Sequence, residues 1–145
     1  MSKKPKSKAV PTQSIKAIAD ADAYYKEHPS WCFSSCDAEQ WKIDEQTLWN
    51  EILPKLKDFE KQTWAGILVD SKALNHSIRT EDLNKVACDR LIEKHIEGES
   101  LISLRLNGTH RLYGYMQNSA FCILWYDVDH GDNAGCVCRS YKKHT

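Results

Sequence analysis

The sequence predicts an α+β domain in which helices pack on one face of a small antiparallel β-meander. Before Gly98, apolar residues recur at helical spacing along two long segments, and after it they alternate with polar residues along three shorter ones. Because the helical segments precede a block of strands, the two kinds of element are expected to form separate layers. A length of 145 residues suffices for one such domain with a buried core.

Charge divides the chain into a tail, residues 1–14, and a single domain, residues 15–145. The first ten residues carry four lysines and no acid, which leaves 16 basic and 20 acidic residues in the rest of the chain. A basic tail of this kind either keeps the protein soluble, which is the interpretation we prefer, or holds loosely to nucleic acid. A weak apolar face over 15–27 predicts a short helix at the start of the domain.

The first long helix is expected over 45–63. Asp44 is a good N-cap residue, and Pro54 must kink or split the helix because proline lacks the backbone N–H. The apolar stripe consists of Leu48, Trp49, Ile52, Leu53, Leu56 and Phe59. A loop is then expected as far as about residue 79.

A second helix is expected over 80–96, with Thr80 as its N-cap and Gly98 just beyond its end. Its predicted buried side consists of Leu83, Val86, Ala87, Leu91 and Ile92. Strands follow at 101–106, 109–116 and 120–127, joined by tight turns as an antiparallel meander, and a strand at 30–34 is expected to join their sheet.

The first hairpin has two possible registers. A two-residue turn at Asn107-Gly108 pairs Leu104 with Arg111, whereas a three-residue loop over 106–108 pairs Leu104 with His110. Because a slip of one residue moves every side chain to the other face, the burial pattern favours the three-residue loop. It directs Ile102, Leu104, His110 and Leu112 to the core, and Ser103, Arg105, Arg111, Tyr113 and Tyr115 outward.

The outward row suits an anionic polymer. Like charges on neighbouring strands repel each other, and a phosphate between Arg105 and Arg111 would replace that repulsion with charge-assisted hydrogen bonds. Tyr113 and Tyr115 offer rings on which unpaired bases can stack. The alternative is that each arginine pairs with a carboxylate, from Asp127, Asp129 or the helix loops. His130, just beyond the last strand, could move protons near neutral pH.

The six cysteines are expected to be free thiols, with Cys122 among the least accessible. Cys32, Cys36, Cys136 and Cys138 could in principle pool four thiolates on one zinc ion. Neither of their spacings is the C-x2-C pattern typical of zinc sites, so we expect no metal and no cofactor. The sequence contains no apolar run long enough to span a bilayer and no secretory signal core, which makes the cytoplasm the expected location.

The stretch "LRLNGTHRLYGYMQNSAFCILWYDVDH" resembles the C-terminal half of the RelE/ParE/HigB-like superfamily of bacterial type II toxins. In that superfamily a β-α-α-β-β-β protein carries L-R-x-x-G-x-x-R-(L/I/V)-x-Y/W on its hairpin. A phage- and plasmid-associated branch, whose last strand reads L-L-W-W-D-P-x-H, looks closest. The likeness covers residues 30–130 in element order and 101–130 in motif.

The resemblance implies an RNA-directed activity. Ribonuclease members bind mRNA in the ribosomal A site, where the 2′-hydroxyl attacks the neighbouring phosphate. By this likeness Arg111 matches the strand arginine that stabilises the phosphate, Arg105 a basic position on the preceding strand, and Tyr113 a frequent aromatic position. His130 lies near the variable C-terminal catalytic position, and Arg139, Tyr141 and Lys142 extend the same surface.

Three functions follow as alternatives. The first is a toxin-like RNA-binding protein, for which the resemblance implies ribosome-dependent mRNA cleavage and neutralisation by an antitoxin protein. The second is a non-catalytic module of the same fold that acts through a protein partner. The third is a small structural domain stabilised by zinc.

Overall fold

The computed structural model describes residues 13–14, 24–129 and 135–138. The predicted helix over 15–27 therefore lies mostly outside the described residues, and 24–26 form a turn. His130, Arg139, Tyr141 and Lys142 also lie outside them. Within the described residues no helix is long and apolar enough to cross a bilayer.

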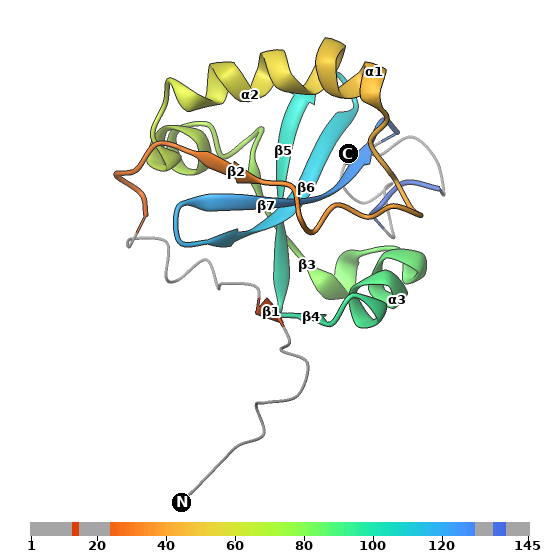
Figure 1. Ribbon diagram of the computed structural model, residues 1–145. Helices are drawn as coiled ribbons and strands as arrows, with labels where there is room; N and C mark the ends of the chain where they lie inside the picture. The colour runs from red at the N-terminus through yellow and green to blue at the C-terminus, as the bar shows by residue number, and fades with distance from the viewer. Residues whose placement is uncertain (1–12, 15–23, 130–134, 139–145) are drawn as a thin grey trace, which may run out of the picture.

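The fold is α+β, built on a five-stranded mixed sheet of order β2-β7-β6-β5-β3 (Figure 1). Its centre is the expected antiparallel meander: β5 (Ser100–Asn107), β6 (His110–Gln117) and β7 (Ala120–Asp127). These strands form because apolar and β-branched or aromatic residues line both of their faces, as in a sheet covered on both sides.

The two edge strands make the sheet mixed and correct the expectation of a purely antiparallel one. β2 (Ser30–Cys32) joins as predicted, but it runs parallel to β7. Parallel partners need a crossover connection, and the chain between β2 and β7 includes every helix described here. β3 (His76–Arg79) pairs antiparallel with β5 inside the stretch that we expected to be a loop.

A second, two-stranded sheet was not expected. β1 (Gln13–Ser14) runs parallel to β4 (Ile96–Glu97), so the last two residues of the predicted tail belong to a strand pair. The described residues of the N-terminal region thus contact the chain just after the second long helix.

The first helical segment forms as predicted, but it is not split at Pro54: the chain stays helical there, and the helix type changes one residue earlier, at Leu53. It consists of α1 (Glu45–Thr47), a π-helical stretch (Leu48–Ile52) and α2 (Leu53–Glu60). Asp44 caps it, since its Oδ1 accepts a hydrogen bond from the Thr47 N–H at 2.7 Å. Pro54, at the start of α2, has no N–H to donate to the preceding turn, and the wider π-helical turns lie directly before it.

The second helix is shorter than predicted. Thr80–Asp82 form a 3-10 turn, and α3 (Lys85–Glu93) begins after Asn84, whose side chain accepts from the Val86 N–H at 2.9 Å. Asn84, and not Thr80, is therefore the cap. A further π-helical turn spans Gly66–Asp70. Of the predicted buried side of α3, Val86 and Ile92 are in fact exposed.

Helices cover both faces of the sheet, not one. Ile52, Leu56 and Phe59 of the first helical segment pack against Leu104 and Leu112. On the opposite face, Ala87 and Leu91 of α3 pack against a second core. Its sheet residues are Leu101, Tyr113, Tyr115, Cys122, Leu124 and Trp125. Two separate hydrophobic cores therefore lie on opposite faces of the sheet. Figure 1 shows the helices that contribute to them, with α1 and α2 on one side of the sheet and α3 on the other.

A buried ion pair joins three elements on the α3 side. Arg90 binds Asp37 through two hydrogen bonds, Nε to Oδ2 at 2.9 Å and Nη2 to Oδ1 at 2.8 Å. Trp125 Nε1 of β7 donates to the same Oδ2 at 2.9 Å, and the backbone N–H groups of Glu39 and Gln40 donate to Oδ1. The side chain of Asp37 is 0% exposed and that of Arg90 15%. This network fixes α3 and the segment after β2 on the sheet.

Gly114 lies at a close approach between β6 and β7. A Cβ atom at this position would overlap the Cys122 carbonyl oxygen and lie 2.7 Å from the Phe121 ring. The pairing of β6 with β7 also shifts by one residue between Tyr113 and Gly114. The absence of a side chain is what permits this contact.

We expect Gly114→Ala to destabilise the protein by about 1–3 kcal/mol, the usual cost of overpacking a core, because backbone must move to admit the methyl group. Gly66→Ala is the matched control. The nearest atoms to a Cβ there are 3.6 Å away, so it should be neutral or stabilise by up to about 1 kcal/mol. Urea unfolding of both variants measures this. Equal stabilities would show that the close approach at Gly114 is wrong.

We expect Asp37→Asn to lower the free energy of unfolding at pH 7 by about 3 kcal/mol, the low end for a broken buried pair, because Arg90 keeps Glu39 and Glu93 as partners. Burial opposes ionisation of Asp37, but the hydrogen bonds from Arg90, Trp125 and two backbone amides outweigh it and lower its pKa. The stability that ionised Asp37 contributes is therefore complete above the pKa of aspartate in the unfolded chain. It is lost as the pH falls from there toward the lower pKa of Asp37 in the folded protein.

The variant should accordingly lose less stability than wild type when the pH falls below about 5. Lys85→Ala is the control, since it removes the exposed Lys85–Asp89 pair on α3 at a cost of about 0.3–0.5 kcal/mol. A variant whose acid sensitivity equals that of wild type would rule out this role for Asp37.

Candidate functional site

The hairpin of β5 and β6 has neither of the two predicted registers. Arg105 pairs directly with Arg111 and Leu104 with Leu112, while Asn107 pairs with His110 across a two-residue turn. Leu106 is the extra residue of a β-bulge. Without the bulge, this two-residue turn would place Arg105 and Arg111 on opposite faces of the sheet, and the extra residue brings them to the same face. The two arginines therefore share a face, as predicted, and lie opposite each other.

Tyr113 and Tyr115 share that face, but the expectation of an outer, base-stacking surface is wrong. Both rings are 0% exposed, because α3, residues 136–138 and the segment after β2 cover them. Tyr113 Oη lies 3.3 Å from Cys138 Sγ, and Tyr115 Oη lies 2.8 Å from Ser35 Oγ. Burial raises the pKa of both hydroxyls. Neither ring is available to a base.

Charged side chains remain where this face reaches the hairpin end of the sheet. Arg105, Arg111 and Asp127 are successive partners across β5, β6 and β7. The Asp127 carboxylate is buried and accepts from the backbone N–H groups of Asp129, at 2.9 Å, and Val137, at 2.8 Å. Burial raises the pKa of Asp127. Asp127 thus anchors the chain around it and does not neutralise an arginine by direct contact.

The two guanidinium groups have few protein partners. Arg111 Nη1 donates to the carbonyl oxygens of Gly108, at 2.7 Å, and His110, at 3.2 Å. Burial lowers the pKa of Arg111 and the nearby charge of Arg105 lowers it further, while Tyr113 and the charge of Asp127 oppose this shift. Arg105 Nε is buried and has no hydrogen-bond partner. Among the described residues, neither arginine forms an ion pair with a carboxylate, which was the alternative to an anion site.

The backbone of Arg105 is held in place by the buried side-chain amide of Asn75. Asn75, just before β3, accepts from the Arg105 backbone N–H at 2.9 Å and donates to the Ile67 carbonyl at 3.3 Å. Thus the position of Arg105 depends on a segment 30 residues earlier. Together with the directly opposed Arg111, this arrangement presents two cations, about 5 Å apart at Cβ, to one ligand. Phosphate or a phosphodiester fits such a pair.

On the opposite face of β6, the predicted core histidine has a polar partner. His110 Nδ1 lies 2.6 Å from Tyr126 Oη, and both side chains are partly or largely buried. Burial raises the pKa of Tyr126. Sequence alternation placed His110 on this face but could not identify Tyr126, because the pairing of β6 with β7 decides it.

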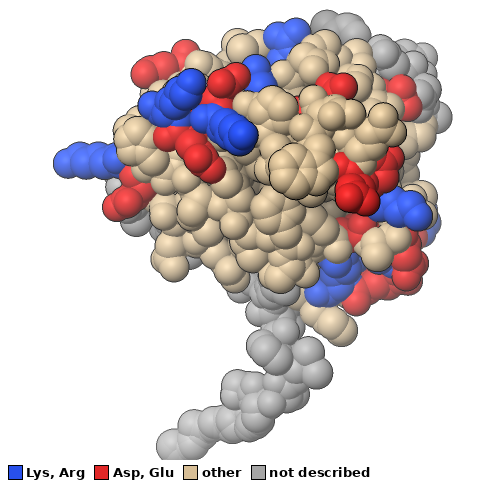
Figure 2. Space-filling view, turned by 45° about the horizontal axis from the view of Figure 1, so that its top comes forward, with Lys and Arg blue, Asp and Glu red and all other residues tan. Residues whose placement is uncertain are grey.

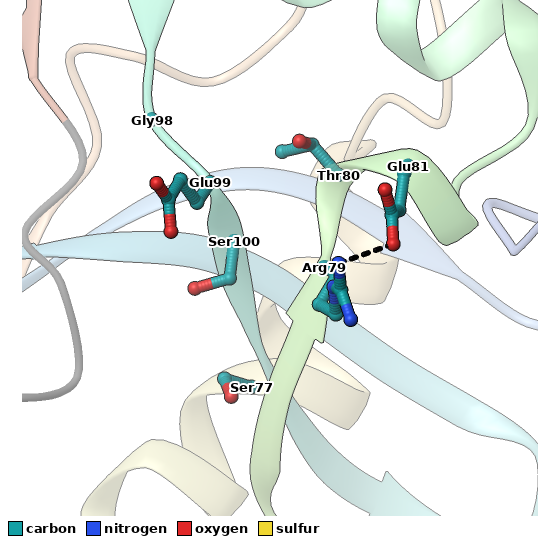
Figure 3. A pocket seen from close by; sticks show the side chains of 7 residues that line it. All are labelled: Ser77, Arg79, Thr80, Glu81, Gly98, Glu99 and Ser100. Carbon is teal, nitrogen blue, oxygen red and sulfur yellow. Dashed lines mark ion pairs between the residues drawn. The ribbon is translucent and has the colours of Figure 1, made fainter.

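A polar hollow lies at the other end of β5, away from the arginines. Its volume is about 460 Å³, and Figure 3 shows the side chains around it. They are Ser77, Arg79, Thr80, Glu81, Gly98, Glu99 and Ser100. Arg79 is already paired with Glu81, and Glu99 adds a second negative charge. This hollow does not favour an anion.

Figure 2 shows one side of the molecular surface, and no wide basic area lies on that side. There, basic and acidic side chains gather together at the margins of a broad uncharged region. That side of the surface therefore offers no long basic groove to an anionic polymer.

The cysteines do not converge on a metal. No group of three or more metal-binding side chains occurs among the residues that the structure describes. Cys32 packs with the core on the α3 side, whereas Cys36 packs with the other core. Cys122, Cys136 and Cys138 are all buried, which confirms the low accessibility predicted for Cys122.

No family model, no characterised protein and no solved structure matches this chain. The similarity of residues 101–130 to the toxin hairpin therefore remains a resemblance in motif. Function has to be inferred from the side chains themselves.

If Arg105 and Arg111 serve to bind an anion, their mutual repulsion should lower the stability of the protein without that anion. We expect Arg105→Met, which keeps an apolar stem, to be as stable as wild type or more stable by up to about 1 kcal/mol in dilute chloride buffer. Inorganic phosphate at equal ionic strength should stabilise wild type more than the variant.

Unfolding by urea in the two buffers measures both effects. Arg79→Met, which removes an exposed and already paired arginine, should shift stability by no more than about 0.5 kcal/mol in either buffer. A loss above 1 kcal/mol for Arg105→Met alone would assign Arg105 to the fold instead.

Proposed function

We propose that this protein binds single-stranded RNA through a phosphate held between Arg105 and Arg111. The supporting observation is the direct pairing of two arginines at one end of the sheet with no carboxylate partner among the described residues. Two opposed guanidinium groups repel each other unless an anion lies between them, and a phosphodiester supplies both charge and acceptor oxygens.

RNA is favoured over a free anion by the place of the pair. It lies beside the β5–β6 turn, where Gly108 is exposed, so a ligand longer than one phosphate could continue past the pair. A Cβ at Gly108 would meet no atom within 4 Å. Because Tyr113 and Tyr115 are buried, contacts to phosphate and not base stacking must supply the affinity, so binding should depend little on sequence.

The resemblance to type II toxins extends this proposal to cleavage of mRNA on the ribosome. In such a reaction the 2′-hydroxyl attacks the adjacent phosphate, and Arg111 would stabilise the negative charge that develops there. His130 is the proposed general base, since its ordinary pKa lies near the working pH. Arg139 and Lys142 would add phosphate contacts. An antitoxin protein is the partner that this function implies.

A second candidate is a module that binds a protein partner without catalysis. It is favoured by an apolar hollow of about 380 Å³ beside α1. Phe33, Cys36, Ala38, Ile43 and Leu48 provide its apolar lining, and Phe33 is exposed. Apolar pockets of this kind anchor partner side chains.

Titration of a labelled single-stranded RNA at two salt concentrations tests the first proposal. Arg111→Ala should weaken binding and reduce the slope of log affinity against log salt by about one unit, because one phosphate contact is lost. Arg79→Ala, at the far end of the sheet, is the matched control and should bind as wild type does.

The cleavage step is tested separately with translating ribosomes and by growth on induced expression. His130→Ala should abolish mRNA cleavage and growth arrest while leaving RNA affinity within about twofold of wild type, since a base acts on the transition state. Identical RNA affinities for wild type and Arg111→Ala would refute the phosphate site. Retained RNA binding without cleavage on the ribosome would leave RNA binding alone as the function.

A further inference from the structure

Two cysteines lie side by side on neighbouring strands. Cys32 of β2 is the direct partner of Cys122 of β7. Partners in a parallel pair direct their side chains to the same face, and neighbouring strands lie about 4.7–4.9 Å apart. That spacing falls within the Cα separation of about 4.4–6.8 Å that a disulfide needs. The two thiols are close enough that each contributes to the pKa of the other.

The two thiols differ in access and in acidity. Cys32 is partly exposed on an edge strand, and its sulfur lies 3.2 Å from Ser34 Oγ. Hydrogen bonds from Ser34 lower the pKa of Cys32. Cys122 is 1% exposed, and burial raises its pKa to about 12. An oxidant from solvent therefore meets Cys32 first, and as the more readily formed thiolate.

We propose that Cys32 and Cys122 form a redox modification site, in which hydrogen peroxide oxidises Cys32 and Cys122 then closes a disulfide between β2 and β7. The Cys32 thiolate sulfur attacks the peroxide O–O bond. An S–O bond forms, the O–O bond breaks, and the departing hydroxide takes a proton to become water. Cys32 is then a sulfenic acid.

In the second step the Cys122 sulfur attacks the Cys32 sulfur. The S–S bond forms, the S–O bond breaks, and the leaving hydroxide takes the Cys122 proton, so a second water departs. Two thiols and one peroxide thus give one disulfide and two waters.

The other thiols are worse placed for this reaction. Cys36 packs with the core on the opposite side of the sheet, and the Cys88 thiol donates to the Thr80 carbonyl at 3.4 Å. Cys136 and Cys138 are both 0% exposed. Neither Cys36 nor Cys88 faces a cysteine across a strand pair, so each serves as a control.

The bond would attach an edge strand covalently to the sheet. β2 is held to β7 by only three residue pairs, and the chain directly after it carries Asp37, the partner of Arg90. Oxidation would therefore secure the whole segment that covers one face of the sheet, at a distance from the proposed RNA site.

The test treats reduced full-length protein with one equivalent of hydrogen peroxide and alkylates the unfolded product. Untreated protein should show six alkylatable cysteines, and treated protein four, with peptide mapping locating the bond at Cys32–Cys122. Cys122→Ser should instead accumulate a Cys32 sulfenic acid that a dimedone probe captures. Cys36→Ser should oxidise at the wild-type rate.

The thermal midpoint of the oxidised protein should rise and return on reduction with dithiothreitol. Six alkylatable thiols after treatment, a disulfide at Cys136–Cys138, or sulfenic acid in wild type that never converts to a disulfide would each overturn the proposal. If Cys122→Ser fails to fold, Cys32→Ser, on the edge strand, tests the same step, because it should abolish peroxide consumption.

Discussion

The buried carboxylate of Asp37 is the constraint on which one half of this structure depends. An ionised group without exposure must receive hydrogen bonds on all sides, and here they come from Arg90 of α3, Trp125 of β7 and two backbone amides. Satisfying that one charge requires α3 and the segment after β2 to lie on the sheet together. Separating the pair would leave a buried charge without its partner, which disfavours other arrangements of the three elements.

That arrangement decides where the protein can meet a ligand. The first helical segment covers one face of the sheet and α3 covers the other. Tyr113 and Tyr115 of β6 are therefore part of the core on the α3 side. Polar chemistry is thereby moved to the ends of the strands. One end of β5 carries the arginine pair, while the other carries the hollow beside Arg79, where charges are already compensated.

The edges of the sheet carry the remaining reactivity. Both β2 and β3 are short edge strands, which limits pairing with other chains. The partial exposure of β2 brings Cys32 to solvent while its partner Cys122 stays within the sheet. A phosphate site at the strand ends and a thiol pair at an edge therefore occupy separate parts of one small domain, and each can be altered without the other.

Features that depend on neighbours along the chain could be predicted from the amino-acid sequence. The meander after Gly98, the cap at Asp44 and the shared face of Arg105 and Arg111 all follow from local pattern. The sequence did not predict that Tyr113 and Tyr115 are buried or that β2 runs parallel to β7. It also did not predict strand β3 or the bulge at Leu106. The alternation of side chains along a strand predicts which of them share a face. Whether that face is buried depends on elements distant in the sequence, here on the hydrogen bond between Trp125 and Asp37, which lie 88 residues apart.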